Sequence, residues 1–531
     1  MSSVKAFIVW FDRNIIGLAR EMRLSYLPPL MVYMAAGISG LTGIVGTFFV
    51  KDYLGLSPEF LAALGFWAGI PWTLKMPLGH LVDIFWRKKG IMVVVGAMLI
   101  CASLVIMIGL IGSPEFMRGF MSIEMWFVLA ALLSPLGYVV QDVVADGMTI
   151  DAVPTSDEFG AVISEDEVKT MHVTMQTLGR VAIVGGSILV SLVNMSIFSG
   201  VAENTPLAIV TPLYLFLYKS ALIIPIVSIS GVFLAYSMRV RERRMLMAQG
   251  FERRDAENIL FGHTAGASPN WLLLWGSVVY VAFVLAIGFS NFGFEQEVVF
   301  VGSLAIVLVL VARLTAMLTT EARRTLIATA IIIFMFRSIP SPGVGQSWWL
   351  ISELHFDQAF LAKLGLIGSC LSVMGMFIFR RFMAERSISF LIVFLSILSG
   401  ILSLPFIGMF YGFHAWTANI TGGFIDARFI AIIDTAIESP FGQIAMIPML
   451  AWIAKSAPTE YKATFFAVMA SFTNLALSLA QLGTKYLNQI FTVTRQDFSD
   501  LGAMMIITSI VGVVLPILAI AVIKALRIKS A

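Results

Sequence analysis

Charged side chains are scarce in this 531-residue chain. Asp, Glu, Lys and Arg make up only 13% of the residues, whereas hydrophobic residues make up 59% and the mean hydropathy is +0.91. A soluble chain usually carries about 25% charged residues, so this one lacks the charge that would cover a water-facing surface. The composition argues against a soluble enzyme, a nucleic-acid-binding module or a disordered scaffold. The net charge of +3 says little about partners.

Cysteine, histidine and the motifs of soluble catalysis are also scarce. Cys101 and Cys370 both lie in apolar runs, which argues against a disulfide framework. The five histidines show no metal-ligand spacing, and the chain has no phosphate-binding loop and no hydrolase or metalloprotease motif. We therefore expect no metal, no cofactor and no enzymatic activity. Without an ATP-binding motif, uphill transport would have to use an ion gradient or an exchanged solute.

Long apolar segments dominate the chain instead. Fourteen of them can each cross a bilayer as a helix, which takes about 20 residues. They lie near residues 27–49, 60–82, 90–112, 124–148, 170–198, 208–237, 270–290, 297–317, 325–352, 358–379, 387–410, 427–453, 461–490 and 501–526. The sequence thus predicts an all-α polytopic membrane protein. Residues 1–26 lack a cleavable signal peptide, and their mixture of apolar and basic side chains predicts a helix at the bilayer surface.

The distribution of Lys and Arg predicts the orientation of these spans. With fourteen spans, 24 of the 35 basic residues fall on the side of the N-terminus and 3 on the opposite side, while 8 lie in the spans or at their edges. Because basic loops stay in the cytosol, both termini are predicted to be cytosolic. The lack of a transit peptide favours a multi-pass protein of the inner (plasma) membrane.

A long basic loop at residues 238–269 divides the chain. Six predicted helices precede it in residues 27–237, and six more fill residues 325–531. Two extra helices lie between these halves, in residues 270–324, and contain few polar residues. Six plus six helices are typical of the parallel repeats of the major facilitator fold. We expect the two extra helices to pack outside the transport core.

Two pairs of acidic residues lie inside predicted spans, where ionisable groups usually have a function. Asp142 and Asp146 on the fourth helix are spaced i, i+4 and therefore share a face. Like charges so close disfavour double ionisation, which suits a proton-carrying site. An ion pair with Arg180 on the next helix would be an equally good, purely structural explanation.

The second acidic pair repeats this spacing in the second half of the chain. Asp434 and Glu438 lie in the segment 427–453, which is the tenth helix of the six-plus-six plan and the counterpart of the fourth. This correspondence supports an internal repeat and makes both residues candidates for proton coupling. Their structural alternative is an ion pair with Lys485 or Arg428.

Cations and an aromatic residue in the spans are candidates for substrate binding. Lys75 lies on the second helix, and Arg337 lies on the seventh helix of the six-plus-six plan, in segment 325–352. Both would face a cavity between the halves, where an anionic substrate binds in this fold. Arg180 is a third candidate cation, and Trp72 could stack on an aromatic ligand. For Lys75, a position near the membrane surface is nearly as good an explanation.

Helix breakers and small residues suggest moving or closely packed helices. Pro340 and Pro342 interrupt the segment 325–352, the seventh helix of the six-plus-six plan, which suits a gate as well as a packing kink. The glycines at 37, 40, 43 and 46 favour close helix packing on the first helix over a functional role.

Several motifs resemble those of known transporters. Residues 79–83, ending in Asp83, and the basic run that begins at Arg87 resemble the loop that latches the cytosolic side of major facilitator proteins. Residues 48–58, 69–79 and 141–147 resemble the folate–biopterin transporter family more specifically, as do weaker matches at 368–382 and 474–476. The resemblance implies a proton-coupled importer of folates, pterins or related organic anions. Carried over by position, it points to Lys75, Asp142 and Asp146, with Asp83 as the latch.

Other functions remain as alternatives. The muropeptide permeases share a similar acidic motif on the fourth helix and also have fourteen helices. A non-transporting assembly factor of the same fold would use the acidic loop 151–167 and the basic loop 239–254 as docking surfaces. An enzyme acting on lipids would need a polar cluster at a membrane face, and the sequence shows none.

Overall fold

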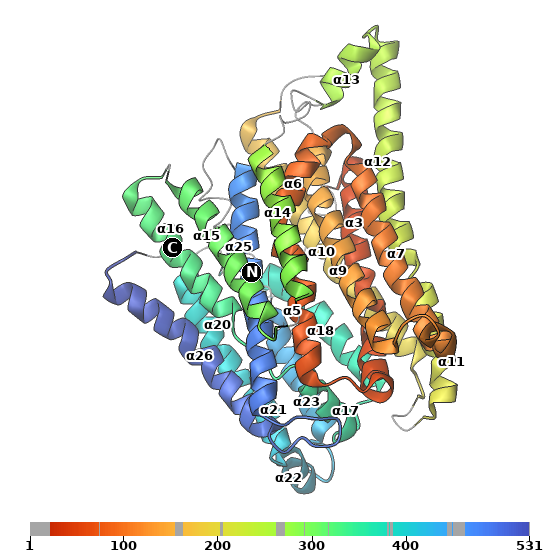
Figure 1. Cartoon of the computed structure of the whole chain (residues 1–531), viewed down its shortest axis with the longest axis vertical. Coiled ribbons are helices and arrows are strands. Elements are labelled where there is room, and N and C mark those ends of the chain that lie inside the picture. The colour runs from red at the N-terminus through yellow and green to blue at the C-terminus, as the bar shows by residue number, and fades with distance from the viewer. Residues whose placement is uncertain are drawn as a thin grey trace, which may run out of the picture.

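The computed structural model describes residues 22–73, 75–153, 163–201, 205–261, 271–290, 292–316, 318–379, 382, 386–442, 449 and 462–529. Over these ranges the regular structure is helical, without strands (Figure 1). Nine helical segments in the same ranges are long and apolar enough to cross a membrane. The predicted surface helix of residues 1–26 lies almost entirely outside the described residues.

The first half of the chain folds into a bundle that begins with a helix in several pieces. A short 3-10 turn, η2 (Leu24–Tyr26), leads into it. Its helices are α3 (Leu27–Ile38) with η3 (Ser39–Thr42), α4 (Gly43–Phe49) and η4 (Val50–Leu54); α5 (Pro58–Thr73) and α6 (Lys75–Ile84); α7 (Gly90–Gly112) and the short α8 (Pro114–Arg118); α9 (Ile123–Ala152); α10 (Glu165–Ile197); and α11 (Leu207–Ser220) with α12 (Ile223–Ala248). Beyond α12, the helix α13 (Arg253–Phe261) projects from one end of the molecule, at the top of Figure 1.

The second half begins after two further helices, α14 (Trp271–Gly288) and α15 (Glu295–Thr315), which correspond to the predicted extra pair. The remaining helices are α16 (Thr320–Arg337), α17 (Val344–Ser352), α18 (Gln358–Ile378), α20 (Ile388–Leu402), α21 (Leu404–Phe410), α22 (Phe413–Ile420), α23 (Ala427–Glu438), α25 (Lys462–Ile490) and α26 (Leu501–Ala525). The helix break predicted from Pro340 and Pro342 falls between α16 and α17, where Gly343 adopts a φ of +70°.

A close helix contact explains one of the four glycines on the first helix. A Cβ atom at Gly37 would lie 2.2 Å from the backbone oxygen of Ile183 on α10, so α3 and α10 pack with their backbones almost touching. At Gly43 a Cβ would meet nothing within 4 Å. The spacing of the glycines therefore predicted close packing correctly, but only part of the pattern takes part in it.

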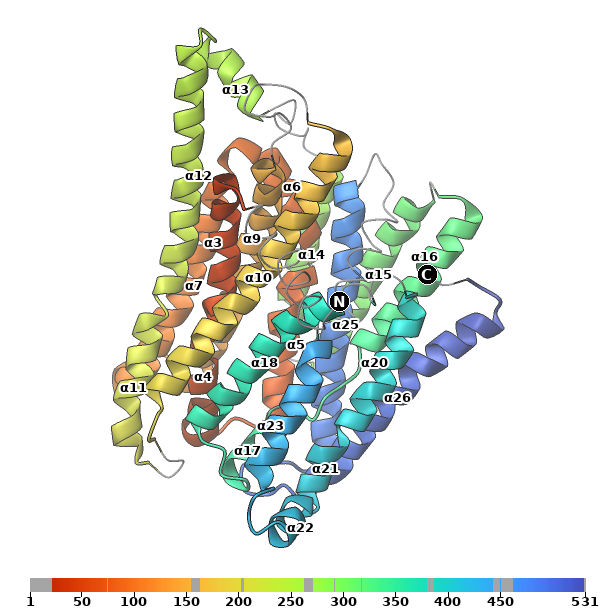
Figure 2. The same ribbon diagram turned by 180° about the vertical axis from the view of Figure 1, so that it is seen from behind.

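The two halves meet along two pairs of helices. α5 packs against α25, and α10 packs against α18, as Figures 1 and 2 show from opposite sides. At the end of the molecule that contains α8, α17 and α22 (the α22 end), one hydrophobic cluster joins both halves, with Phe48, Ile111, Trp348 and Met504 among its members. Toward the end that carries α13 (the α13 end), two smaller clusters contain described residues of the first half only and another contains residues of the second half only. A further cluster also joins the halves, since it contains Phe66 and Ile70 of α5 and Leu475 of α25, so the hydrophobic contacts between the halves are not confined to the α22 end.

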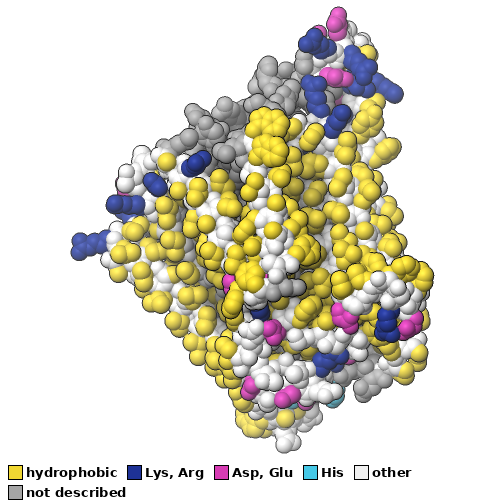
Figure 3. Space-filling model, in the orientation of Figure 1, with side chains coloured by type: hydrophobic (Ala, Val, Ile, Leu, Met, Phe, Trp, Pro, Cys, Tyr) yellow, Lys and Arg dark blue, Asp and Glu magenta, His cyan; other side chains and the backbone are white. Residues whose placement is uncertain are grey.

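The outer surface is that of a membrane protein. Figure 3 shows a broad band of hydrophobic side chains, with charged side chains gathered toward the two ends of the molecule. The helices α14 and α15 pack against each other, and α15 also contacts α5 and α25. Phe66 and Ile70 of α5 share a hydrophobic cluster with Val299 and Phe300 of α15, which places the extra pair over the line where the halves meet.

Candidate functional site

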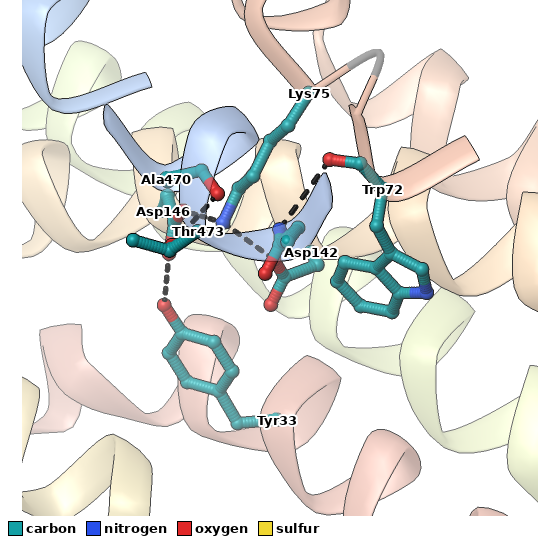
Figure 4. A network of polar contacts seen from close by, with 8 residues as sticks. Tyr33, Trp72, Lys75, Asp142, Asp146, Ala470 and Thr473 are labelled. Carbon is teal, nitrogen blue, oxygen red and sulfur yellow. Dashed lines mark hydrogen bonds and ion pairs between the residues drawn. The ribbon is translucent and has the colours of Figure 1, made fainter. Parts of the chain in front are cut away.

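Four ionisable side chains from three helices form a compact network inside the first half. Lys75, the first residue of α6, places its Nζ atom 2.7 Å from Oδ2 of Asp142 and 2.8 Å from Oδ2 of Asp146. The hydroxyl of Tyr33 on α3 donates a hydrogen bond of 2.8 Å to Oδ1 of Asp146. Figure 4 shows the lysine reaching down between the two carboxylates, with the tyrosine on the opposite side.

The network is recessed but not sealed. The side chains of Lys75, Asp142 and Asp146 are 16%, 25% and 40% exposed, so water or a solute can reach them in this state. One lysine alone cannot neutralise both carboxylates. Arg180 on α10 lies within electrostatic reach of Asp142, but it forms no ion pair with any residue that the structure describes. The predicted structural partner of the aspartates is thus replaced by Lys75.

Buried polar contacts on the other face of α9 hold the two aspartates in this orientation. Gln141, which is 2% exposed, donates from Nε2 to the carbonyl oxygen of Val93 on α7 (3.2 Å) and to Oγ of Ser228 on α12 (3.0 Å). The buried Lys89 donates to the carbonyl oxygen of Gly147 (3.1 Å). Because these contacts fix the rotation of α9, its i, i+4 carboxylates face the interior of the protein.

The side chain of Tyr33 was not singled out from the sequence. It is 6% exposed, and its ring packs on Gly179 of α10, where a Cβ atom would lie 3.0 Å from the ring. A single tyrosine in an apolar helix gives no signal of its own. Only the folded structure brings it to Asp146, which lies 113 residues further along the chain.

The C-terminal half reaches this region through α25. Nδ2 of Asn474 donates to the carbonyl oxygen of Trp72 at 3.4 Å, three residues before Lys75. Figure 4 shows the indole of Trp72 beside the ionic network. Trp72 is half-buried where the halves meet.

Arg337 is a cation without an anionic partner among the described residues. It is the last residue of α16 and is partly buried, and its Nη1 atom lies 3.8 Å from the sulfur of Met449. A half-buried guanidinium offers up to five donors to an anion.

The acidic pair of the second half has a different environment. Asp434 is 3% exposed and its Oδ1 atom has no hydrogen-bond partner, whereas Glu438 is exposed. Their predicted structural partners bind elsewhere: Lys485 pairs with Glu297 of α15 at 3.4 Å, and Arg428 pairs with Asp357 at 2.8 Å. The prediction of an ion pair between either cation and this acidic pair is therefore wrong.

The candidate gating residues are only partly described. Asp83 lies in α6, and its side chain is outside the described residues, whereas Arg87 is exposed. Between Pro340 and Pro342, the backbone N–H of Ser341 donates to the hydroxyl of Thr484 on α25 (3.1 Å), which ties the α16–α17 break to that helix. The described residues also contain no group of three or more side chains suited to hold a metal ion.

The sequence is similar to that of named transporters. The sequence profile of the BT1 family matches residues 36–530. Over 486 residues the chain is 22% identical to the folate-biopterin transporter of Synechocystis sp., which covers 91% of this chain and 78% of that protein. A shorter match of 191 residues is 27% identical to the probable folate-biopterin transporter 6 of Arabidopsis thaliana and covers 34% of this chain and 36% of the relative.

The fold is similar to that of solved transporters. The peptide transporter POT in complex with alafosfalin aligns with a TM-score of 0.58 and 15% identity, over 97% of this chain and 95% of that chain. The nucleoside transporter NupG aligns with a TM-score of 0.51 and 13% identity, over 95% of this chain and 100% of that chain. The predicted all-helical transporter fold is thereby confirmed. The chain is a membrane transporter and belongs to the BT1 family.

Proposed function

We propose that this protein imports a folate-like or pterin-like organic anion together with protons, by alternating access between two helical halves. The observation that carries the proposal is the position of Lys75 between Asp142 and Asp146 in a recessed, partly exposed site. Ionisable side chains inside a span are costly, so they usually have a function. The names of the two relatives supply the substrate class.

The network suggests how a proton could be coupled to an anion. While both aspartates are ionised, two negative charges hold Lys75 and leave it little attraction for a further anion. A proton on Asp142 or Asp146 removes one of these charges, loosens the hold on Lys75 and makes the site more positive. Anion and proton would then favour the same state of the protein, which is the thermodynamic requirement for symport.

The substrate would be held by groups from both halves. Lys75 and Arg180 would attract one anionic group from the side of the first half, and Arg337 would bind another from the side of the second half. Trp72 would stack on an aromatic ring, a contact worth about 1 kcal/mol beyond the buried area. A flat ring system with separated carboxylates satisfies all of these groups, which favours a folate-like solute over a neutral one.

The remaining parts of the proposal concern topology. The protein would have fourteen spans, divided among residues 27–237, 270–324 and 325–531. It would lie in the inner membrane of the cell, with both termini and the α13 end in the cytosol. Because a hydrophobic cluster joins both halves at the α22 end, this state would be closed to the outside. The next step of the cycle would separate the halves there.

Other predicted residues would act in gating and proton release. Asp83 and Arg87 would form the cytosolic latch, and the break at Pro340 and Pro342 would let α17 move against α16. Asp434 and Glu438 would provide a second protonation site.

Uptake into proteoliposomes tests the proposal. The purified protein is reconstituted, and the accumulation of labelled folate is measured with an inward proton gradient, without it, and with a protonophore. Accumulation that needs the gradient and disappears with the protonophore is the expected result. Equal uptake in all three conditions would contradict proton coupling. No uptake of folate, followed by uptake of a pterin or a muropeptide in the same vesicles, would overturn the folate assignment.

A further inference from the structure

The contact between α5 and α25 follows a regular seam. Two glycines of α5 face polar side chains of α25: a Cβ atom at Gly65 would lie 2.9 Å from Oε1 of Gln481, and one at Gly69 would lie 3.0 Å from Oγ of Ser478. One turn further along, Asn474 donates to the carbonyl oxygen of Trp72. We call these three contacts the α5–α25 seam. Along both helices their spacing is about one turn, so a single face of each helix is involved.

The seam leads to a helical segment that contains two prolines, Pro71 in α5 and Pro77 in α6. Neither proline has a backbone N–H, so the carbonyls of Trp67 and Thr73 lose their usual helical partners. The helical hydrogen bonding is therefore weakened on both sides of Trp72, and groups outside the helix can change the geometry there.

Two halves of the protein act on this short segment from opposite sides. The amide of Asn474, from the C-terminal half, binds the Trp72 carbonyl. Three residues further along, Lys75 binds the two aspartates of the N-terminal half. A displacement of α25 relative to α5 would move the Trp72 carbonyl and, through the segment weakened by the two prolines, Lys75.

We propose that Asn474 is a positioning residue, which links the position of the C-terminal half to the ion pair of Lys75. When the halves change position, the Asn474–Trp72 hydrogen bond breaks or re-forms and alters the reach of Lys75 toward Asp142 and Asp146. The proposal rests on the proposed proton-coupled transport, and it makes Asn474 necessary for coupling but not for substrate binding.

The experiment compares two kinds of transport in the same proteoliposomes. Gradient-driven accumulation of folate requires coupling, whereas exchange of labelled for unlabelled folate without a gradient requires only binding and alternation. The variants are Asn474→Leu, which is similar in volume and lacks the donor, and Asn474→Gln, which keeps an amide. Thr473→Val is the matched control, because the buried Thr473 hydroxyl donates only to Ala470 of its own helix.

The expected result separates the two activities. Asn474→Leu lowers accumulation about fivefold, the equivalent of one hydrogen bond, and leaves exchange within about twofold of the original protein. Asn474→Gln restores part of the accumulation, and Thr473→Val behaves as the original protein does. If Asn474→Leu yields too little protein, Asn474→Ala is measured in the same way.

Two results would overturn the inference. One is full gradient-driven accumulation by Asn474→Leu or Asn474→Ala. The other is an equal loss of exchange and accumulation, which would make the residue a packing element of the seam. A failure of the proposed function is a different outcome, since the original protein would then show exchange without any effect of the gradient.

Discussion

The two acidic pairs of this transporter have the same spacing but different surroundings. On α9, Asp142 and Asp146 share one lysine, and a tyrosine donates to the second of them. On α23, Asp434 is almost fully buried without a partner for Oδ1, and Glu438 is exposed. An ionised carboxylate is stabilised in the first environment, whereas a buried carboxyl without a cation is tolerated best when it is protonated. Identical spacing in the sequence thus conceals two different kinds of site.

This difference assigns different roles to the two pairs. The α9 pair holds a charge that can change when a proton or an anion arrives, so we expect the coupling to depend on it. The α23 pair has no ion-pair partner among the described residues, and its replacement should disturb transport less. The four groups of substitutions below test the contrast, from the largest expected effect to the smallest.

Removal of the shared cation should have the largest effect. Lys75→Met leaves two aspartates facing each other and makes the α9 pair resemble the α23 pair. Removal of one partner from a buried ion pair destabilises a protein by about 3–5 kcal/mol, and partial exposure reduces this cost to about 2 kcal/mol. If that cost falls on the transporting state, uptake should decrease roughly thirtyfold. Uptake per folded protein in proteoliposomes measures it. Lys219→Met, at an exposed lysine of α11, is the control and should leave uptake unchanged.

Neutralisation of either aspartate of the α9 pair should remove the coupling. Asp146→Asn and Asp142→Asn each keep the shape of the side chain but cannot exchange a proton. We expect a roughly tenfold loss of gradient-driven accumulation, about 1.4 kcal/mol, while exchange without a gradient persists. Full accumulation with the usual dependence on the gradient in both variants would show that the protons bind elsewhere.

Loss of the tyrosine hydroxyl should have a smaller effect. Tyr33→Phe keeps the packing of the ring against Gly179 and removes only the hydrogen bond to Asp146. A hydrogen bond to a charged group contributes about 1.5 kcal/mol at the low end, so we expect roughly fivefold slower gradient-driven uptake, allowing for partial exposure. Thermal unfolding of the detergent-solubilised protein checks the fold. A large drop in stability together with lost exchange would make Tyr33 a structural residue.

Substitution of the α23 pair should have the smallest effect. Asp434→Asn replaces a carboxyl that has no cation, and uptake should fall by less than about threefold because no ion pair is lost. Glu438→Gln, at the exposed member of the pair, should change uptake even less. If Asp434→Asn instead removes gradient dependence as completely as Asp146→Asn does, the contrast between the two pairs is wrong.

Much of the fold follows from the sequence, since long apolar segments predict most of the helices. The extra pair α14 and α15 and the break at Pro340 and Pro342 were predicted within a few residues. Asp142 and Asp146 stand out because two carboxylates in an apolar helix are costly. Patterns such as apolar length, prolines and acidic pairs describe one helix at a time and say nothing about how helices pack together.

The partners of these residues could not be predicted from the sequence. Lys75 was nearly as well explained by a position at the membrane surface, and Arg180 was the expected ion-pair partner of the aspartates. The choice depends on the rotation of α9, which Gln141 and its contacts with Val93 and Ser228 determine. Contacts between distant segments, such as that of Tyr33 with Asp146, arise only when helices pack.

Proton movement that accompanies the substrate tests the central claim most directly. Proteoliposomes loaded with a pH-sensitive dye are mixed with folate in the absence of any imposed gradient. The account predicts that folate acidifies the interior when the original protein is present, and that Asp146→Asn abolishes this signal. Folate entry without acidification, or equal acidification with Asp146→Asn, would contradict proton coupling through the α9 pair.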